Sequence, residues 1–162
     1  MYKRIKSEKG FTLVDITVAI IVILLFMSLI AVLFFFFFKS SKSIDRKSEA
    51  IYLATEIIEG FSAQNYDDVK ITGTSSQENW IEITNPNDSN DLYGMVNGEA
   101  TEFVKNVKIK EGYSCSVSIY NYIPEENTHE SDLVKVIKVR VTYKVANERK
   151  NVELTTSIVR ND

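Results

Sequence analysis

Asp15 is the only charged side chain between Phe11 and Phe38, a stretch that is otherwise almost entirely apolar. A carboxylate held away from water is costly unless it is protonated or meets a positively charged partner. The first chemistry that the sequence suggests is therefore a charge pairing at Asp15. The alternative is an acid that is tolerated because it lies near the end of a membrane segment, where water is close.

The other reactive side chains give weaker indications. Cys115 is the only cysteine, which excludes an intrachain disulfide, and its place in an alternating segment predicts a small buried core residue. His129 is the only histidine, and the composition of the surrounding "PEENTHESD" predicts an exposed turn. A catalytic group that depends on histidine is therefore not supported. We expect no catalytic residue, no cofactor and no enzymatic activity.

Asparagine, aspartate and glycine gather in residues 84–100, and Asn85–Gly98 could offer oxygen ligands to Ca²⁺. The segment lacks the alternating acid spacing of a calcium loop, because Leu92 follows where a further ligand or a glycine is needed. We therefore expect a solvated loop and no metal site. Trp80 lies just before this segment and is expected to be a packing residue, with ligand contact through an exposed ring as the alternative.

Length and charge limit the remaining function classes. The chain has 162 residues and a net charge of −3, so no large basic surface is implied and no nucleic acid partner is expected. Charged residues make up 25% of the chain and hydrophobic residues 44%, which is typical of a folded protein. Once the apolar stretch is set aside, the rest is sufficient for one modest domain.

Residues 11–38 are predicted to form a helix that can cross a membrane. As a helix they would span about 42 Å, against about 30 Å of hydrocarbon in a bilayer. The run is too long for the apolar part of an ordinary secretory signal, which has about 7–15 residues. Orientation is left open by charge alone, because basic residues precede and follow the run: Lys3, Arg4, Lys6, Lys9, Lys39, Lys42, Arg46 and Lys47.

Residues 39–63 are predicted to continue this helix with an amphipathic pattern. Neither proline nor glycine interrupts residues 11–59, and Gly60 begins the first plausible end. Apolar residues recur at helical spacing and are expected to form one buried stripe: Ile44, Ile51, Ala54, Ile57, Ile58 and Phe61. A stripe of this kind needs a surface on which to pack.

Three downstream segments supply that surface. Residues 113–123, 133–145 and 151–160 alternate apolar and polar side chains, which predicts antiparallel strands with one face in water. Residues 146–151 are expected to form the turn between the last two, and residues 79–83 a shorter strand. The inward face is expected to carry Tyr113, Cys115, Val117, Ile119, Ile123, Ile137, Val139, Val141, Tyr143, Val145, Val152, Leu154, Thr156 and Ile158.

The predicted fold class is α+β. A long N-terminal helix has a protruding hydrophobic half, residues 11–38, and an amphipathic half, residues 39–63, that packs on an antiparallel sheet. Residues 64–162 form the globular head that contains the sheet, and residues 1–10 precede the helix as a short basic segment that ends in glycine.

Residues 1–38 closely resemble a class III prepilin signal. The resemblance rests on "KGFTLVD", a glycine followed by Phe11, Thr12, an apolar pair and an acid, and on the apolar run behind it. The family comprises the type IV pilins and the pseudopilins of type II secretion and DNA-uptake machines. The order of a long helix and then a sheet is also similar to that family, and the later segments look most like a minor pilin or minor pseudopilin.

The resemblance implies a specific order of processing, membrane insertion and assembly. A prepilin peptidase would cleave after Gly10 and leave residues 1–10 as a removed leader, and the new amino group of Phe11 would be N-methylated. Asp15 would neutralise the amino terminus of a neighbouring subunit. The subunit would wait in the cytoplasmic membrane with its N-terminus inside and then join a cell-surface filament through its helix. Its partners would be other pilin subunits, the peptidase, and the assembly platform with its ATPase.

The chain departs from the family in three places. The family usually has Glu where this chain has Asp15, and often has a proline where this chain has Val32. The C-terminal cysteine pair of many Gram-negative pilins is missing, so we expect a bacterial source with a Gram-positive cell among the candidates. Residues Phe34–Phe38 are expected to pack against other filament helices without a special function.

Three functions stay open at this stage. The first is a structural assembly subunit of a type IV pilus or related filament. The second is a tip adhesin or binding module of the same filament. The third is an unrelated single-pass membrane protein with a small β ectodomain, which would not need the residues that resemble a processing site.

Overall fold

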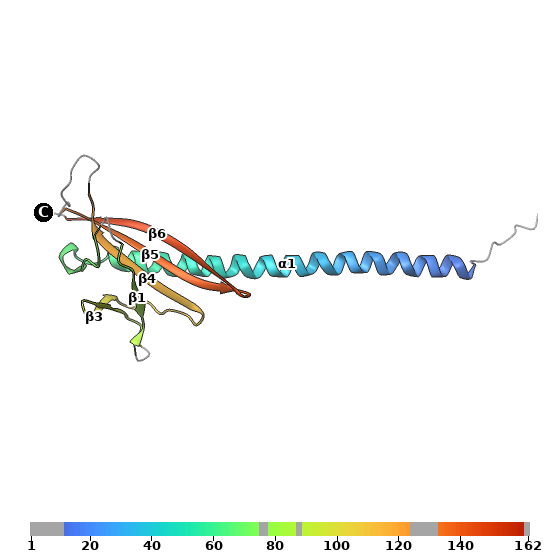
Figure 1. Cartoon of the computed structure of the whole chain (residues 1–162), viewed down its shortest axis with the longest axis horizontal. Coiled ribbons are helices and arrows are strands. Elements are labelled where there is room, and N and C mark those ends of the chain that lie inside the picture. Colours follow the sequence, from blue (N-terminus) through green and yellow to red (C-terminus); the bar gives the residue numbers. More distant parts are fainter. Residues whose placement is uncertain (1–11, 75–77, 87–88, 124–132, 161–162) are drawn as a thin grey trace, which may run out of the picture. The chain divides into compact units, whose positions relative to one another are not determined.

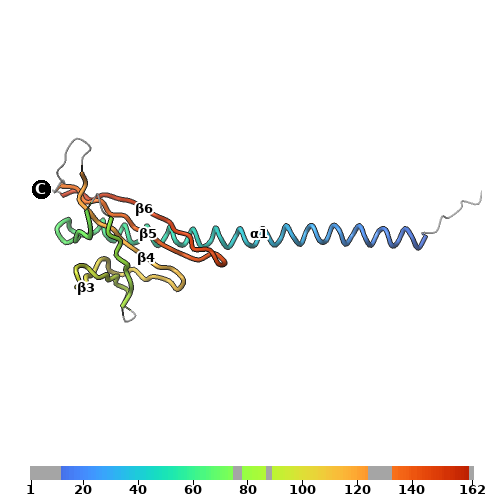
Figure 2. Tube along the Cα trace, in the orientation of Figure 1, coloured from blue at the N-terminus to red at the C-terminus, as the bar shows by residue number. Residues whose placement is uncertain are grey.

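The computed structural model describes residues 12–74, 78–86, 89–123 and 133–160. In these residues one long helix precedes six strands, and Figures 1 and 2 show the path of the chain through them. The elements are α1 (Leu13–Ser62), the 3₁₀ turn η1 (Tyr66–Asp68), β1 (Ile81–Thr84), β2 (Leu92–Val96), β3 (Glu99–Val104), β4 (Tyr113–Asn121), β5 (Val134–Val145) and β6 (Glu148–Val159). The α+β class predicted from the sequence is confirmed. The chain divides into two compact units, Met1–Lys42 and Ser43–Asp162.

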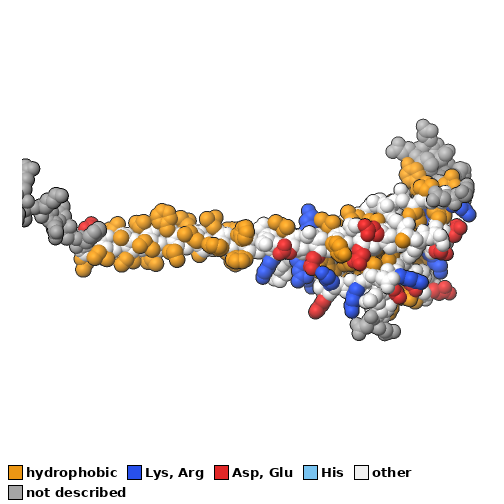
Figure 3. Space-filling model, turned by 180° about the vertical axis from the view of Figure 1, so that it is seen from behind, with side chains coloured by type: hydrophobic (Ala, Val, Ile, Leu, Met, Phe, Trp, Pro, Cys, Tyr) orange, Lys and Arg blue, Asp and Glu red, His pale blue; other side chains and the backbone are white. Residues whose placement is uncertain are grey.

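The first half of α1 lies in the unit Met1–Lys42 and buries no side chain up to residue 38. Every large hydrophobic residue there is at least 43% exposed, from Leu13 at 79% to Phe38 at 61%. On the face drawn in Figure 3, hydrophobic side chains cover this half of the helix. This half of the helix is apolar on all sides and therefore has no polar face to turn toward water.

The second half of α1 packs on the sheet through Ala50, Leu53, Ala54, Ile57 and Phe61, with Ile58 partly buried beside them. The spacing of three and four residues places these side chains on one face of the helix. The predicted stripe was wrong at two positions. Ile44 is 64% exposed and Ile51 is 39% exposed.

These two errors have a common physical cause. The side chains at 50, 53 and 57 define the centre of the contact with the sheet, and position 51 lies at its border. Position 44 is seven residues before position 51 and so lies on the same side of the helix, away from that centre. Small Ala50 and Ala54 are both fully buried, which brings the helix backbone close to the sheet.

All six strands form one antiparallel sheet in the order β3-β2-β1-β4-β5-β6. Two meanders of three strands each, β1–β3 and β4–β6, are joined by the pairing of β1 with β4. The predicted long strands are confirmed as β4, β5 and β6, and the short one as β1. The last hairpin turns more tightly than expected, because β6 begins at Glu148 directly after Ala146 and Asn147.

The prediction of a loop over residues 84–100 was wrong. This segment contains β2 and the beginning of β3, which pair as a hairpin. Asn97 has φ 52° and Gly98 has φ 85°, which are values that a tight two-residue hairpin turn requires. The Asn-Gly dipeptide is therefore the turn of a hairpin rather than part of a continuous loop.

The core lies between the inner face of the sheet and residues 50–61 of α1. Cys115, Val117 and Ile119 of β4 are fully buried, and Ile137 and Val139 of β5 face them across the ladder. At the helix end, the rings of Phe61 and Phe103 meet edge to face with centroids 6.0 Å apart. The predicted inner face of β5 is thereby confirmed, as is that of β4 up to Ile119, whereas Ile123 lies beyond β4 and is half-buried.

Candidate functional site

Asp15 lies in the first turn of α1 and takes part in a capping box with Thr12. The Thr12 backbone N–H donates to Asp15 Oδ2 at 3.0 Å, and the Thr12 hydroxyl donates to the same oxygen at 2.6 Å. In return, the Asp15 backbone N–H donates to Thr12 Oγ1 at 3.3 Å. Both partners thus satisfy backbone donors that the start of a helix otherwise leaves open.

This arrangement gives Asp15 a role within its own chain. The spacing Thr-x-x-Asp is a known sequence sign of a capping box, and the sequence interpretation missed it. Gly10 and Phe11, the expected processing residues, lie outside the described residues, as does His129.

The largest candidate interaction surface is the first half of α1. α1 is long and apolar enough to cross a membrane by length and composition, and its most apolar window buries nothing within the described chain. The aromatic run ends this half, with Phe34 and Phe38 stacked at 6.4 Å between ring centroids. Exposed apolar surfaces of this kind are typical of segments that contact other apolar groups.

In the head, a polar cluster fixes the beginning of the packed half of α1 to the sheet. The Tyr113 hydroxyl donates to Glu49 Oε2 at 2.5 Å, and Lys110 Nζ donates to Glu49 Oε1 at 3.0 Å. The Arg46 guanidinium lies 5.5 Å from the centre of the Tyr113 ring. The hydrogen bond from Tyr113, together with Lys110, holds the pKa of Glu49 below its ordinary value. Burial raises the pKa of Tyr113.

Lys135 is a buried charge that the sequence interpretation did not place. It faces inward on β5, is 7% exposed, and donates to the carbonyl oxygens of Tyr66 at 2.7 Å and Val69 at 2.8 Å. Its Nζ also lies 4.0 Å from the centre of the Tyr66 ring. Burial lowers the pKa of Lys135. These contacts hold the segment that follows α1 against the sheet, which is a structural role.

The outer face of the sheet carries a ladder of charged and aromatic side chains. Trp80 is half-buried there, with the Arg140 guanidinium 3.8 Å from its ring centre and its Nε1 donating to Glu78 at 3.2 Å. Lys138 donates to Glu78, and Arg140 donates to Glu153. The hydrogen bond from Lys138 lowers the pKa of Glu78. Trp80 is therefore a packing residue on the outer face, as predicted, and its partners are charged.

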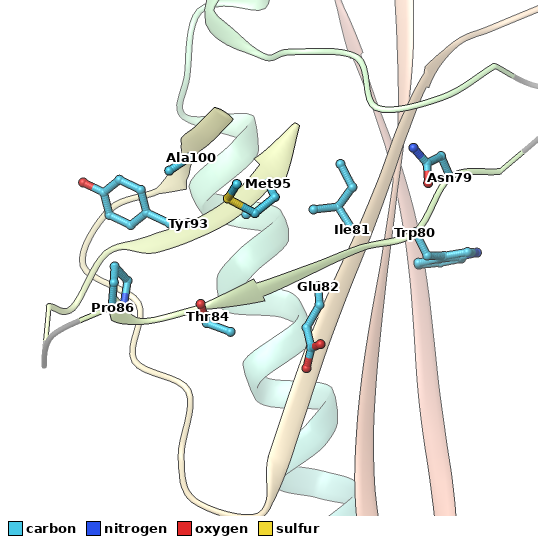
Figure 4. Close-up of a pocket in the computed structure, with 10 residues that line it drawn as sticks. Asn79, Trp80, Ile81, Glu82, Thr84, Pro86, Tyr93, Met95 and Ala100 are labelled. Atoms are coloured by element: carbon cyan, nitrogen blue, oxygen red, sulfur yellow. The ribbon is translucent and has the colours of Figure 1, made fainter. Parts of the chain in front are cut away.

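A shallow cavity of about 590 Å³ lies beside Trp80, over β1 and the β2–β3 hairpin (Figure 4). Its lining mixes aromatic, apolar and polar side chains: Asn79, Trp80, Ile81, Glu82, Thr84, Pro86, Tyr93, Gly94, Met95 and Ala100. Met95 is 59% exposed. Aromatic and polar side chains therefore lie side by side in this cavity.

In residues 84–100, asparagine and aspartate side chains bond the backbone of neighbouring turns. Asn85 Nδ2 donates to the Val107 carbonyl at 2.8 Å, and Asn85 Oδ1 accepts from the Ile109 N–H at 2.8 Å. Asp91 Oδ1 accepts from the Asn106 N–H at 3.0 Å. Across the described residues, no group of three or more His, Cys, Asp or Glu side chains could hold a metal ion.

Cys115 lies on the inner face of β4 and is fully buried. Burial raises the pKa of its thiol to about 12, so the thiolate is scarce at neutral pH. This environment agrees with the predicted core role of Cys115.

Comparisons of the chain with models of protein families, with curated proteins and with solved structures give no match.

Proposed function

We propose that this chain is a structural subunit of a type IV pilus or a related filament, most like a minor pilin or minor pseudopilin. The observation that carries the proposal is the first half of α1, whose apolar side chains are exposed all round and begin directly behind "KGFT". The packed half of the same helix on an antiparallel sheet supports the comparison with a pilin-like fold.

In this proposal, lipid and neighbouring helices surround residues 13–38 in turn. Before assembly, the bilayer solvates these side chains, and the chain crosses the cytoplasmic membrane once with its N-terminus inside. After assembly, the same side chains pack against equivalent helices of other subunits in a cell-surface filament. Because lipid and helix are about equally apolar, the transfer is governed by packing and polar contacts rather than by further burial from water.

Processing would create the polar contact. A prepilin peptidase would cleave after Gly10, and the amino group of Phe11 would be N-methylated and positively charged. Asp15 of a neighbouring subunit would form an ion pair with that amino group. The Thr12–Asp15 capping box supports this role, because it holds one carboxylate oxygen at the helix start and thereby fixes the direction of the group.

The mass of the mature N-terminus tests this function. In native membranes we expect loss of residues 1–10 and one added methyl group on Phe11, seen by mass spectrometry of the N-terminal peptide. An intact Met1 terminus would refute the processing and with it the filament assignment. A Gly10→Ala variant is a weaker test, because alanine is tolerated by some peptidases of this kind.

The cavity beside Trp80 favours a second candidate, in which the head acts as a binding module at a filament tip. It combines aromatic surfaces from Trp80 and Tyr93 with polar groups from Asn79, Glu82 and Thr84. Retention of filament formation with loss of surface adhesion in a Trp80→Ala variant would support this candidate. Equal adhesion by the variant and the wild type would refute it.

A further inference from the structure

The two edges of the sheet differ in how well they are protected. β6 forms one edge and pairs with β5 through twelve consecutive residue pairs, from Val145 with Glu148 to Val134 with Val159. It contains neither proline nor glycine, and no bulge interrupts its register. The charges of β6 lie in its first half, at Glu148, Arg149, Lys150 and Glu153, and residues 154–159 carry none. A long edge strand without proline or a bulge can accept another strand, and the charges on it restrict which strand that is.

The structure also shows which backbone groups β6 offers. The Arg160 N–H donates to the Leu133 carbonyl at 2.9 Å, so this even-numbered residue is bonded to β5. Antiparallel ladders alternate between residues that bond the neighbour and residues that bond outward. Odd-numbered residues from Arg149 to Val159 therefore direct their N–H and C=O groups away from β5. No backbone hydrogen bond to these groups occurs outside the ladder in the described part of the chain.

β3 forms the opposite edge and is shorter and partly occupied. Its register with β2 shifts between Leu92 and Tyr93, and Gln64 Nε2 donates to the Phe103 carbonyl. Beyond the turn at Asn97 and Gly98, Ala100 and Glu102 are the residues that direct backbone groups outward, because Glu99 and Thr101 alternate with them in bonding β2. The open part of this edge is therefore the short segment around Ala100 and Glu102.

We propose that the β6 edge of one copy of this chain pairs with the β3 edge of the next copy. The strand order decides this choice of partner. In an antiparallel sheet of six strands the two edge strands run in opposite directions, so a second copy in the same orientation presents β3 antiparallel to β6. Such a head-to-tail contact repeats from copy to copy and keeps all helices in the same direction.

Pairing of two β6 edges is the competing arrangement of copies. It would be related by a two-fold axis and would turn the packed segments of the two α1 helices in opposite directions. The proposed filament instead needs the packed segments of all α1 helices to run in the same direction. This choice rests on the proposed function, which supplies the common orientation.

Charge selects a register for the head-to-tail pair. With Glu102 opposite Arg149, Ala100 falls opposite Asn151, and all four residues are ones that direct backbone groups outward. Opposite charges across a strand pair are favourable, whereas moving Glu102 along to face Glu153 would place like charges together. Arg149 is exposed and forms no ion pair with the described residues. Glu102 already meets Lys105 Nζ at 3.4 Å and the Tyr93 hydroxyl at 3.0 Å, and Arg149 of the next copy would join these exposed contacts.

Cysteine crosslinking of the full chain in native membranes tests the pairing. The double variant Glu102→Cys with Arg149→Cys places both thiols on the outer face of a hydrogen-bonded pair, about 5.5 Å apart between Cα atoms, which a disulfide can span. We expect a ladder of dimers and larger species on non-reducing gels, absent from each single variant. The matched control, Glu102→Cys with Lys150→Cys, moves one thiol to the opposite face and should give no ladder.

A second pair of variants separates the edge contact from loss of folding. Asn151→Pro, added to the crosslinking pair, removes an outward N–H and should abolish the ladder while the head stays folded. Thr155→Pro also removes an outward N–H, but it lies beyond the six-residue partner strand and should leave the ladder largely intact. Equal loss of the ladder from both, with both heads folded, would count against the proposed register.

Crosslinking within the apolar half of α1 tests the filament proposal independently of the edge pairing, so that either proposal can be refuted without the other. An Ile23→Cys variant reports contact between apolar helices. Helix crosslinks without the 102–149 ladder would overturn the edge pairing and leave the filament proposal standing. The ladder in chains that keep residues 1–10 would support the edge pairing and count against the filament proposal. A crosslink through Leu154→Cys alone would overturn the head-to-tail pairing in favour of paired β6 edges.

Discussion

The two halves of α1 share one backbone conformation but differ in what stabilises them. Residues 13–38 are apolar on every side and bury nothing, whereas residues 50–61 bury one narrow stripe that the sheet covers. The comparison teaches that a strongly apolar sequence is not by itself a sign of a core. The core helix here is the half with charged residues on its outer face, whereas the more apolar half packs on none of the described residues.

The largest expected effect comes from truncating the stripe. Ile57 is fully buried, and Ile57→Ala should lower the free energy of unfolding of the head by about 2–5 kcal/mol, because it removes contacts and leaves a cavity. Urea unfolding in detergent micelles, followed by the fluorescence of Trp80, would measure the change. The matched control is Ile20→Ala in the exposed half, which should leave head stability unchanged. Equal losses of stability from both variants would contradict the conclusion that only the packed half of α1 stabilises the head.

A smaller effect is expected where the packed half of α1 comes closest to the sheet. A Cβ added at Gly60 would lie within 2.2 Å of Val104 Cγ1, and valine has few alternative rotamers. Gly60→Ala should therefore destabilise the head by about 1–3 kcal/mol through overpacking. The same urea experiment applies. If Val104→Ala in the same chain does not recover part of the loss, the clash with Val104 is not its cause.

The sequence predicted the long elements because their patterns are regular over many residues. β4, β5 and β6 alternate over nine to twelve residues, and α1 has no breaker before Gly60. The β2–β3 hairpin could not be recognised by alternation, although its Asn97-Gly98 turn is a strong hairpin signal that the sequence interpretation missed. Its inner face carries Gly94, because a side chain there would collide with Phe103 and Ile81, and this glycine made a strand resemble a loop.

The candidate site was predictable only in part. The apolar run and Asp15 are visible in the sequence, and the Thr12–Asp15 spacing could also have been recognised. Lys135 could not have been placed, because its partners are two backbone carbonyls whose positions depend on the path of the chain after α1. Periodicity predicts which face a residue occupies, but it does not predict the backbone groups that a buried charge will meet.

The capping box offers a local test of the exposed half. Thr12→Val removes the hydroxyl that both donates to Asp15 and accepts from its N–H, so the first turn of α1 should fray. We expect several-fold faster amide hydrogen exchange in the first turn of the helix, with no change around Ile57. The matched variant Thr17→Val, whose hydroxyl bonds only the Val14 carbonyl, should have little effect there. Faster exchange throughout α1 would show that the two halves are coupled.

The smallest effect is expected at the polar cluster that anchors the packed half. Because the pKa of Glu49 is held below its ordinary value near 4.5, its contribution to stability is complete above that value and is lost as the pH falls through the lowered pKa. Wild type should therefore exceed Glu49→Gln in stability at pH 7, and the two should converge once the pH has fallen through the lowered pKa. Thermal unfolding across this range would measure the difference, with Tyr113→Phe as a variant that removes the strongest donor to Glu49. A difference that stayed constant with pH would mean that Glu49 acts through packing, and the second half of α1 would then be held by its apolar stripe alone.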